Sequence, residues 1–209
     1  MTCGGIVLCG GRSTRMGSSK ALLPFGTETM LQRVVRLLGT VVSPLVVVTA
    51  SGQTLPSLPA TVHLARDERE GRGPLEGLRA GLKALPDAIE MAYVTGCDVP
   101  LLVPDFVRRM IELIDDFDVA APEIDGFTHP LSAVYRRSTL PDIEALLAQE
   151  RLRPLFLFET VRTRRVQADE LRSADPELMT LRNINTRGDY LDALASAGLA
   201  PPPQLPTSR

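Results

Sequence analysis

The sequence has too few cysteines, too little positive charge and no apolar run long enough for several classes of protein. Its three cysteines are Cys3, Cys9 and Cys97, an odd number without a C-x-x-C pair, which favours neither a disulfide framework nor a zinc site. The formal net charge of −2 disfavours nucleic acid as a partner. No stretch approaches the roughly 18 apolar residues of a membrane-spanning helix, and no positively charged leader opens the chain. These absences predict a cytoplasmic protein without a membrane segment.

The composition that remains is typical of one α/β domain. Of the 209 residues, 44% are hydrophobic and 23% are charged, which is close to the average of globular proteins. We expect a single domain over residues 1–198. The Pro-rich end at 199–209 has the composition of a disordered tail.

Apolar runs alternate with helical patterns through residue 121, and this alternation predicts the fold class. It favours a three-layer α/β fold, with a mostly parallel twisted sheet, right-handed crossovers and helices on both faces. In such sheets ligands bind at the carboxyl ends of the strands. The expected strands are 4–8, 45–50, 62–64, 92–95 and 118–121, and the expected helices are 29–38, 75–85 and 106–114, the last with Pro104 or Asp105 as its N-cap.

The second half of the chain has a different pattern. An extended segment over 130–135 precedes a helix over 140–148, and a strand-like stretch over 163–167 precedes a last helix over 186–197. We interpret these segments as an inserted hairpin and a closing helix.

A glycine-rich segment follows the first strand directly and has the residues that a triphosphate needs. Glycines let backbone N–H groups approach phosphate oxygens, and Arg15 and Lys20 supply positive charge for the β- and γ-phosphates. The pattern is neither a Walker A loop nor a Rossmann fingerprint. A flexible surface loop with solvated basic side chains is the alternative. The segment runs Leu8-Cys9-Gly10-Gly11-Arg12-Ser13-Thr14-Arg15-Met16-Gly17-Ser18-Ser19-Lys20.

Two carboxylates are expected at the same sheet edge as this loop. Asp98 follows the strand that ends near Thr95, and Asp67 follows the short strand at 62–64. A carboxylate is a hard oxygen ligand that suits Mg²⁺, which bridges carboxylates to substrate phosphates. We therefore regard Asp98 as the best candidate metal ligand. Capping of the turn before Pro100 remains the alternative for Asp98, and a solvated loop charge remains the alternative for Asp67.

Glycines flank the start of the helix after Asp67, in Gly71-Arg72-Gly73-Pro74-Leu75-Glu76-Gly77-Leu78. They would let a base or ribose lie close to the backbone. A helix that begins with Gly73 as N-cap and Pro74 at the first position would give the same sequence without a ligand. Both readings stay open on the sequence alone.

The second half contains weaker candidates for binding a co-substrate. His129 could meet a phosphate, although a structural role for this histidine is the commoner case. Asn185 or Thr186 is a plausible N-cap of the last helix, but capping does not explain Asn183 as well. Five arginines could receive an anionic co-substrate or form a solvated basic face: Arg151, Arg153, Arg162, Arg164 and Arg165.

Together these segments resemble the molybdenum cofactor guanylyltransferases, within the wider class of nucleotidyltransferases that open with L-x-G-G-x-S-x-R-M-G-x-x-K. Residues 8–20 match that opening. The resemblance continues through residues 73–77, where the family usually has G-P-L-A-G, and to about Leu194. It includes Cys97-Asp98-Val99-Pro100, His129-Pro130-Leu131-Ser132-Ala133-Val134-Tyr135 and Asn183-Ile184-Asn185-Thr186.

The resemblance implies a Rossmann-like nucleotidyltransferase fold and roles for particular residues. It implies that Leu8, Cys9, Gly10 and Lys20 contact GTP, that Asp67 binds the guanosine part, and that Asp98 binds Mg²⁺ as well as nucleotide. We also expect the nucleotide to lie near Gly11, Gly73, Pro74 and Gly77. The candidates for the acceptor are His129, Arg153, Asn183 and Asn185.

The chain departs from the family pattern at three positions. Cys9 replaces the usual Ala, Glu76 replaces a small residue, and Thr49 stands where some members have an Asn that touches the nucleotide. A carboxylate at Glu76 could accept hydrogen bonds from N1 and N2 of guanine.

The implied reaction is transfer of GMP from GTP to molybdopterin, with release of pyrophosphate. The implied substrates are GTP and molybdopterin, and a molybdoenzyme or its chaperone is an expected transient partner. Three alternatives remain on the sequence: the same reaction with CTP, transfer to another phosphorylated acceptor, and a non-catalytic nucleotide-binding module.

Overall fold

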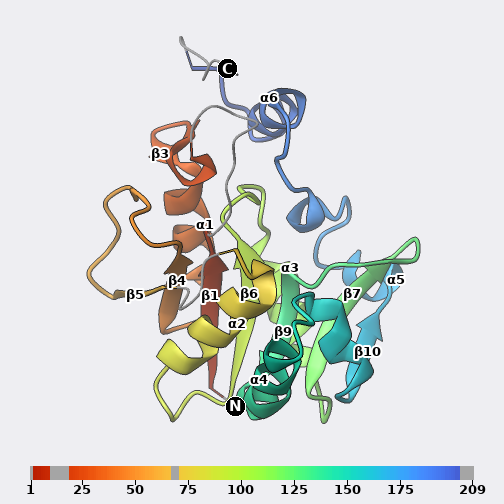
Figure 1. Ribbon diagram of the computed structural model, residues 1–209. Helices are drawn as coiled ribbons and strands as arrows, with labels where there is room; N and C mark the ends of the chain where they lie inside the picture. Colours follow the sequence, from red (N-terminus) through yellow and green to blue (C-terminus); the bar gives the residue numbers. More distant parts are fainter. Residues whose placement is uncertain (1, 10–18, 67–70, 203–209) are drawn as a thin grey trace.

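The computed structural model describes residues 2–9, 19–66 and 71–202, and within them it has the predicted three-layer architecture (Figure 1). The strands are β1 (Cys3–Leu8), β2 (Pro24–Phe25), β3 (Glu28–Thr29), β4 (Leu45–Thr49), β5 (Val62–Arg66), β6 (Met91–Gly96), β7 (Val119–Ile124), β8 (Phe127–Thr128), β9 (Ser132–Arg136) and β10 (Thr163–Val166). The α-helices are α1 (Met30–Leu38), α2 (Gly73–Ala84), α3 (Pro104–Glu112), α4 (Leu140–Ala148), α5 (Ala168–Leu171) and α6 (Arg187–Ser196).

The central sheet has the order β10-β7-β9-β6-β1-β4-β5. β1 is parallel to β4 on one side and to β6 on the other, with Leu8 opposite both Val48 and Gly96. The strands β4 and β6 are buried throughout and β1 is buried after its first residue, which explains their nearly continuous apolar runs. The ends of these three strands therefore meet at one edge of the sheet.

β9 departs from the sequence prediction. The segment expected to be part of an inserted hairpin is instead a strand of the central sheet, antiparallel to both β6 and β7. Its first residue, Ser132, lies opposite Thr95 near the end of β6. Because β9 runs in the opposite direction, its beginning lies at the carboxyl edge of the parallel strands.

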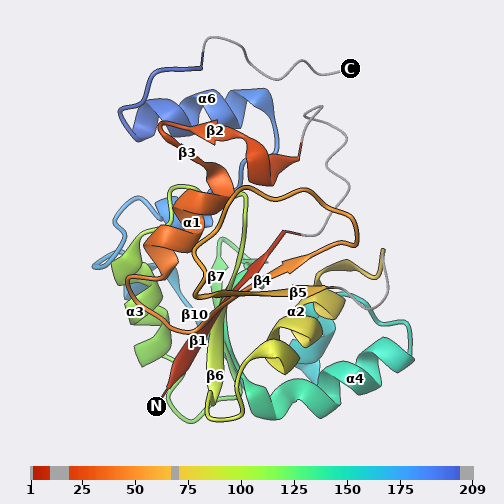
Figure 2. The same ribbon diagram turned by 90° about the vertical axis from the view of Figure 1, so that its left-hand side faces the viewer.

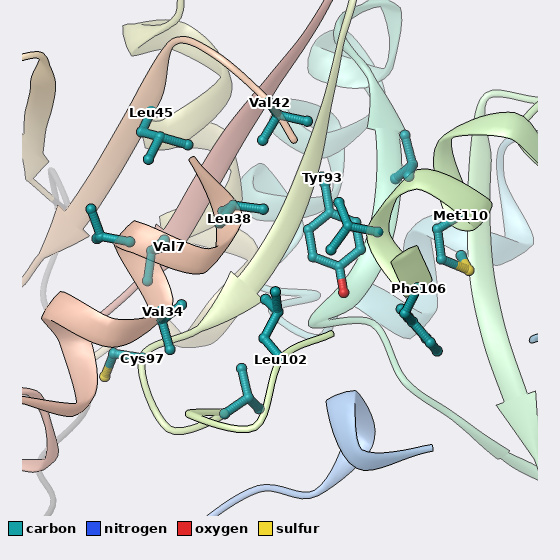
Figure 3. Packing of buried hydrophobic residues seen from close by; sticks show 14 of the residues in the cluster. Val7, Val34, Leu38, Val42, Leu45, Tyr93, Cys97, Leu102, Phe106 and Met110 are labelled. Carbon is teal, nitrogen blue, oxygen red and sulfur yellow. The ribbon is translucent and has the colours of Figure 1, made fainter. Parts of the chain in front are cut away.

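The helices cover both faces, as the sequence predicts (Figure 2). One core cluster lies between the sheet and the helices α1 and α3. Figure 3 shows Leu38 and Phe106 of these helices in this cluster with Tyr93 of β6. A second cluster lies between the sheet and α2 and α4, where Leu78 and Leu146 are buried. No helix in the described part of the chain is long and apolar enough to cross a membrane.

A third, smaller core lies beyond the carboxyl edge of the sheet. Phe25 of the β2–β3 hairpin and Tyr190 of α6 are buried in it, and Leu199 packs against it. Both ribbon views place α6 and the hairpin above the ends of β1 and β6 (Figures 1 and 2). The last helix is therefore fixed next to the edge where ligands are expected.

The helix starts differ in detail from the predictions. The N-cap of α3 is Val103, so Pro104 is the first helical residue, where its fixed φ and missing N–H cost nothing. Arg72 is the N-cap of α2, and Gly73 is inside the helix with a φ of 73°. For α6 the predicted cap Thr186 is confirmed: its hydroxyl accepts from the Asp189 N–H, and the Asp189 carboxylate accepts from the Thr186 N–H.

Candidate functional site

The carboxyl edge of the sheet brings Lys20 and Asp98 together, although 78 positions separate them in the chain. Asp98 follows β6 by two residues, and Lys20 begins a short 3₁₀ turn at the end of the glycine-rich segment. Lys20 Nζ donates to Asp98 Oδ2 at 3.0 Å, and each side chain is 18% exposed. The contact places Lys20 and Asp98 at the same edge of the sheet, where both are expected from the sequence.

Lys20 has a second partner that the sequence did not indicate. Its Nζ donates to Asn185 Oδ1 at 2.8 Å, in the segment that leads into α6. Asn185 is held in turn because its backbone N–H donates to Asp189 Oδ2 at 2.9 Å. The backbone N–H groups of Asn185 and Thr186 lower the pKa of Asp189, so this carboxylate is charged at neutral pH. Asn185 thus joins the C-terminal segment to the site, while Asn183 is exposed.

The floor of the site is formed by the ends of β1 and β4. The Cys9 N–H donates to the Val48 carbonyl at 2.8 Å, and the Cys97 N–H donates to the Leu8 carbonyl at 3.1 Å. Thr49 is buried at the end of β4, and Gln53 Nε2 donates to the Cys9 carbonyl at 3.0 Å. Leu8, Cys9 and Thr49 are therefore adjacent to each other and to the start of the Asp98 loop.

Cys9 is a structural thiol in this arrangement. The adjacent Cys97 thiol, burial and the charge of Asp98 raise the pKa of the Cys9 thiol well above its usual value. Both cysteines are buried and pack as small apolar groups. The replacement of Ala by Cys at this position keeps the floor apolar.

Four predicted residues lie outside the described part of the chain: Gly10, Gly11, Arg15 and Asp67. Gly73, Pro74 and Gly77 lie in the first turns of α2, after β5 and thus near the same edge. Gly73 approaches the chain near Arg153, since a Cβ on Gly73 would lie 3.5 Å from the Leu152 carbonyl. Arg153 is exposed and forms no ion pair with another described residue.

His129 lies three residues before Ser132, where β9 begins next to the end of β6. Its backbone N–H donates to the Pro122 carbonyl at 2.8 Å. Burial lowers the pKa of the half-buried imidazole, so His129 is neutral at pH 7. It would meet a phosphate as a neutral hydrogen-bond donor and not as a cation.

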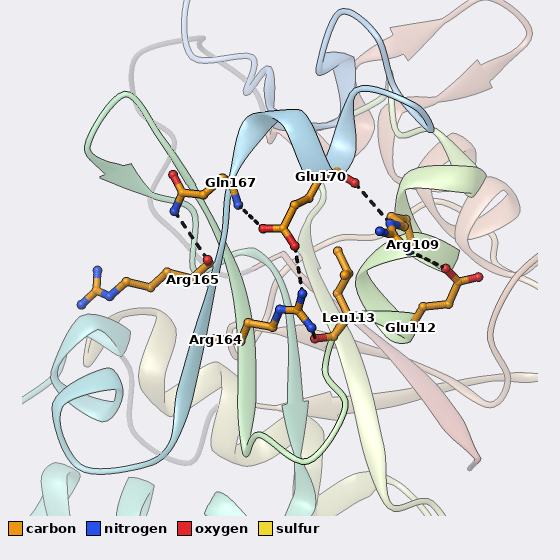
Figure 4. Close-up of polar contacts among 7 residues, drawn as sticks. All are labelled: Arg109, Glu112, Leu113, Arg164, Arg165, Gln167 and Glu170. Atoms are coloured by element: carbon orange, nitrogen blue, oxygen red, sulfur yellow. Dashed lines mark hydrogen bonds and ion pairs between the residues drawn. The ribbon is translucent and has the colours of Figure 1, made fainter.

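Most of the arginines proposed as a basic surface are already paired with carboxylates. Arg164 Nη2 lies 2.9 Å from Glu170 Oε1, and its Nη1 donates to the Leu113 carbonyl at 3.0 Å (Figure 4). These carboxylate partners favour the alternative of a solvated basic face over a site for an anionic co-substrate. The other pairs are Arg151 with Glu159, Arg162 with Asp116 and Arg165 with Glu123.

Glu76 faces the interior of the protein and not an open base site. It is 2% exposed, and its Oε1 accepts from Arg79 Nη2 at 2.6 Å, one turn further along α2. A carboxylate in a buried ion pair is held by its partner. Glu76 is therefore not available to accept hydrogen bonds from guanine, contrary to the sequence-based expectation.

Replacing Arg79 by Met should lower the free energy of unfolding by about 3–5 kcal/mol, because Glu76 would keep a buried charge without its partner. Urea denaturation measures the loss. Arg108→Met is the matched control: Arg108 pairs with Asp105 at the same spacing on α3, but these side chains are 50% and 70% exposed. We expect a loss of at most about 1 kcal/mol there. Equal losses in both variants would contradict the buried-pair interpretation.

Gly96 leaves the space that the Asp98 carboxylate occupies. A Cβ at this position would lie 2.4 Å from Asp98 Oδ1, and the backbone of Gly96 needs no positive φ. Gly96→Ala should therefore turn the carboxylate away without breaking β6. We expect at least a tenfold loss of Mn²⁺ affinity, measured by electron paramagnetic resonance.

Gly188→Ala is the control for this substitution. An added Cβ at Gly188 on α6 meets only Thr186 Oγ1 at 3.6 Å, which is an ordinary contact. We expect its Mn²⁺ affinity to equal that of the unmodified protein. If Gly96→Ala behaves in the same way, the space beside Asp98 does not matter for metal binding.

A metal ion fits the chemistry of this edge. Asp98 offers a partly exposed carboxylate, and the cation that it now contacts is the Lys20 ammonium. No group of three or more His, Cys, Asp or Glu residues that could hold a metal occurs in the described ranges. A site with one protein carboxylate suits Mg²⁺, which keeps waters and shares substrate phosphates.

The fold and the site together are those of a nucleotidyltransferase: an α/β sheet with a Lys–Asp pair at its carboxyl edge, in a chain whose sequence is glycine-rich directly after β1. Residues 5–166 match the family model described as the MobA-like NTP transferase domain. The chain therefore belongs to the MobA-like nucleotidyltransferase family.

Curated relatives match nearly the whole chain. A probable molybdenum cofactor guanylyltransferase of Methanosarcina acetivorans is 37% identical over 205 residues, which cover 91% of this chain and 89% of the relative. One from Pelotomaculum thermopropionicum is 32% identical over 193 residues, which cover 92% of both. These relatives show that the chain is a member of the molybdenum cofactor guanylyltransferase family.

The fold has a counterpart among solved structures. The molybdopterin-guanine dinucleotide biosynthesis protein A of Archaeoglobus fulgidus superimposes with a TM-score of 0.76, covering 95% of this chain and 99% of that one. The sequences are 21% identical, so this likeness supports the fold.

Proposed function

We propose that the protein transfers GMP from GTP to the terminal phosphate of molybdopterin. An oxygen of that phosphate attacks the α-phosphorus of GTP in line, the bond to the β-phosphate breaks, and pyrophosphate leaves. The products are the guanine dinucleotide form of the cofactor and pyrophosphate. The observation that carries the proposal is the meeting of Lys20, Asp98 and Asn185, one from each of three family motifs, at a single point.

The protein's part in this reaction is positioning and charge neutralisation. Backbone groups at Leu8 and Cys9 would receive the nucleotide, with Gly10 and Gly11 beyond them. Lys20 would bind the leaving pyrophosphate together with Arg15. Asp98 would hold Mg²⁺, which would neutralise phosphate charge during transfer.

The remaining nucleotide contacts would come from residues at the same edge of the sheet. Asp67, Thr49 and the start of α2 at Gly73, Pro74 and Gly77 would surround the base and ribose. His129, Arg153, Asn183 and Asn185 stay our candidates for the acceptor. Asn185 is the best supported of them, since it touches Lys20.

Two measurements test the proposal. Thermal stabilisation by GTP, CTP, ATP and UTP with Mg²⁺ should be largest for GTP; a larger effect of CTP would indicate a cytidylyltransferase. Pyrophosphate release should require GTP and molybdopterin together. Nucleotide binding without any release would identify a non-catalytic nucleotide-binding module instead.

A further inference from the structure

A buried carboxylate that is not among the predicted site residues lies behind the loop that carries Asp98. Asp175 is 2% exposed, between α5 and the 3₁₀ turn η4 (Met179–Leu181). Its oxygens accept from the N–H groups of Met179 and Thr180, each at 2.9 Å, and from the Thr180 hydroxyl at 2.8 Å. Among the described residues no Lys or Arg pairs with it. These three bonds compensate for its burial and fix the turn.

Thr180 connects Asp175 to the loop that carries Asp98, residues 98–103, by hydrogen bonds. Its hydroxyl is fully buried and has one proton, which it donates to Asp175. The hydroxyl oxygen then accepts from the Val103 N–H at 3.0 Å. Because the backbone N–H of Val103 can only donate, the hydroxyl oxygen is the acceptor of that bond and its proton is left for Asp175.

The segment 179–185, which contains Thr180, also holds the other end of the loop that carries Asp98. The Ile184 N–H donates to the Asp98 carbonyl at 2.9 Å, so residues 98–103 are bonded to this segment at both ends. Asn185, the next residue, binds Lys20. A movement of the segment would therefore displace Asp98 and Lys20 together.

Apolar packing alone does not orient this loop. Val99 and Leu102 are buried in the first core cluster, where Figure 3 shows Leu102 near Tyr93. Packing of this kind is not directional. The Thr95 hydroxyl of β6 has no hydrogen-bond partner among the described residues, so it adds no directed bond to the loop. Hydrogen bonds from outside the loop hold its backbone at three points: the bonds to residues 180 and 184 fix its two ends, and Arg33 Nε donates to the Pro100 carbonyl at 2.8 Å between them.

We propose that Asp175 and Thr180 are positioning residues of the transfer reaction: they set the place of Asp98 relative to Lys20 through the Val103 and Ile184 bonds. This inference rests on the proposed function. Neither residue touches a substrate. Their loss should change metal binding and turnover more than it changes stability.

The test is Thr180→Val, which keeps the shape of the side chain and removes the hydroxyl. We expect turnover to fall at least tenfold and Mn²⁺ affinity of the nucleotide-free protein to weaken at least tenfold, the latter measured by electron paramagnetic resonance. Thr180→Ser keeps both bonds and should restore both values to within about threefold of the unmodified protein. Asp175→Asn should behave like Thr180→Val, because an amide cannot accept at both oxygen positions.

Thr139→Val is the matched control. Thr139 is 1% exposed, and its hydroxyl donates to the Arg136 carbonyl at 2.7 Å, before α4 and away from the Asp98 loop. Thr139→Val loses one buried hydrogen bond and Thr180→Val loses two, so the thermal unfolding temperature should fall in both variants and further in Thr180→Val. Turnover and Mn²⁺ affinity of Thr139→Val should stay unchanged.

Equal turnover and Mn²⁺ affinity in Thr180→Val and Thr139→Val would overturn the inference. Should Thr180→Val fail to fold, Thr180→Cys makes the same comparison with a weaker donor. Asp98→Asn is measured alongside to separate the two proposals. If Asp98→Asn keeps its Mn²⁺ affinity, the proposed metal site is wrong; if it loses the metal and Thr180→Val does not, only the positioning role is wrong.

Discussion

Asp98→Asn is expected to lower turnover by about 10²- to 10³-fold, the usual effect of losing one preorganised charge-stabilising group. Asn has the same size and its oxygen can still accept from Lys20, but it lacks the negative charge that holds Mg²⁺ against the phosphates. Pyrophosphate release with GTP and molybdopterin measures the effect. Unmodified turnover of Asp98→Asn at saturating Mg²⁺ would refute the assignment of this residue.

The folded structure should survive this substitution. The Lys20–Asp98 pair is partly open to solvent, and ion pairs of this kind contribute about 0–1 kcal/mol to stability. The thermal unfolding temperature should therefore change little. Asp105→Asn is the control, because Asp105 also pairs with a basic side chain but lies on the exposed face of α3. Its turnover should equal that of the unmodified protein.

The parallel half of the sheet could be predicted because burial on both faces leaves a clear pattern. β1, β4 and β6 are short, β-branched and apolar, and helical spacing separates them, so both the layers and the shared edge follow. β9 could not be placed in the same way. The apolar pattern of its buried residues does not indicate whether the strand is parallel or antiparallel. Its pairing with β6 and β7 depends on contacts between residues distant in the sequence.

The site was predictable to the same extent. Lys20 and Asp98 meet because each follows a strand whose end lies at the same edge, which a local pattern reveals. The contact of Lys20 with Asn185 depends on how α6 packs against the β2–β3 hairpin, through a small core that joins the two ends of the chain. The capping pattern predicted the role of Thr186, but it did not predict the contact of Asn185 with Lys20.

Charged residues were the least predictable, because a sequence does not show which charges cancel. Glu76 and Arg79 are one helical turn apart, and the packing of α2 against the sheet and α4 makes their pair a buried one. Arg164 looked like part of a free basic surface, but its carboxylate partner is supplied by α5. Asp175 gave no signal at all, since its role depends on a turn and a loop that meet only in the fold.

Lys20→Met should have opposite effects on turnover and on metal binding. Turnover should fall by about 10²- to 10³-fold, because the leaving pyrophosphate would lose a positive charge. Free Mn²⁺ should nevertheless bind at least about tenfold more tightly in the absence of nucleotide. In the present structure the ammonium occupies the place of a cation beside Asp98, and a divalent ion about 4 Å from it would be repelled by roughly 2 kcal/mol even at the dielectric constant of water.

The simple loss of an active-site residue would weaken the binding of metal and nucleotide alike. An increase in metal affinity would therefore show that Lys20 competes with the metal for Asp98. Lys83→Met, at the only other lysine of the chain, is the control: Lys83 pairs with Glu144 on the exposed side of α2 and should change neither quantity. If Lys20→Met binds free Mn²⁺ less tightly, Lys20 supports the metal site. If it binds more tightly, Lys20 holds Asp98 until nucleotide phosphates arrive, and then moves to them as the metal takes its place.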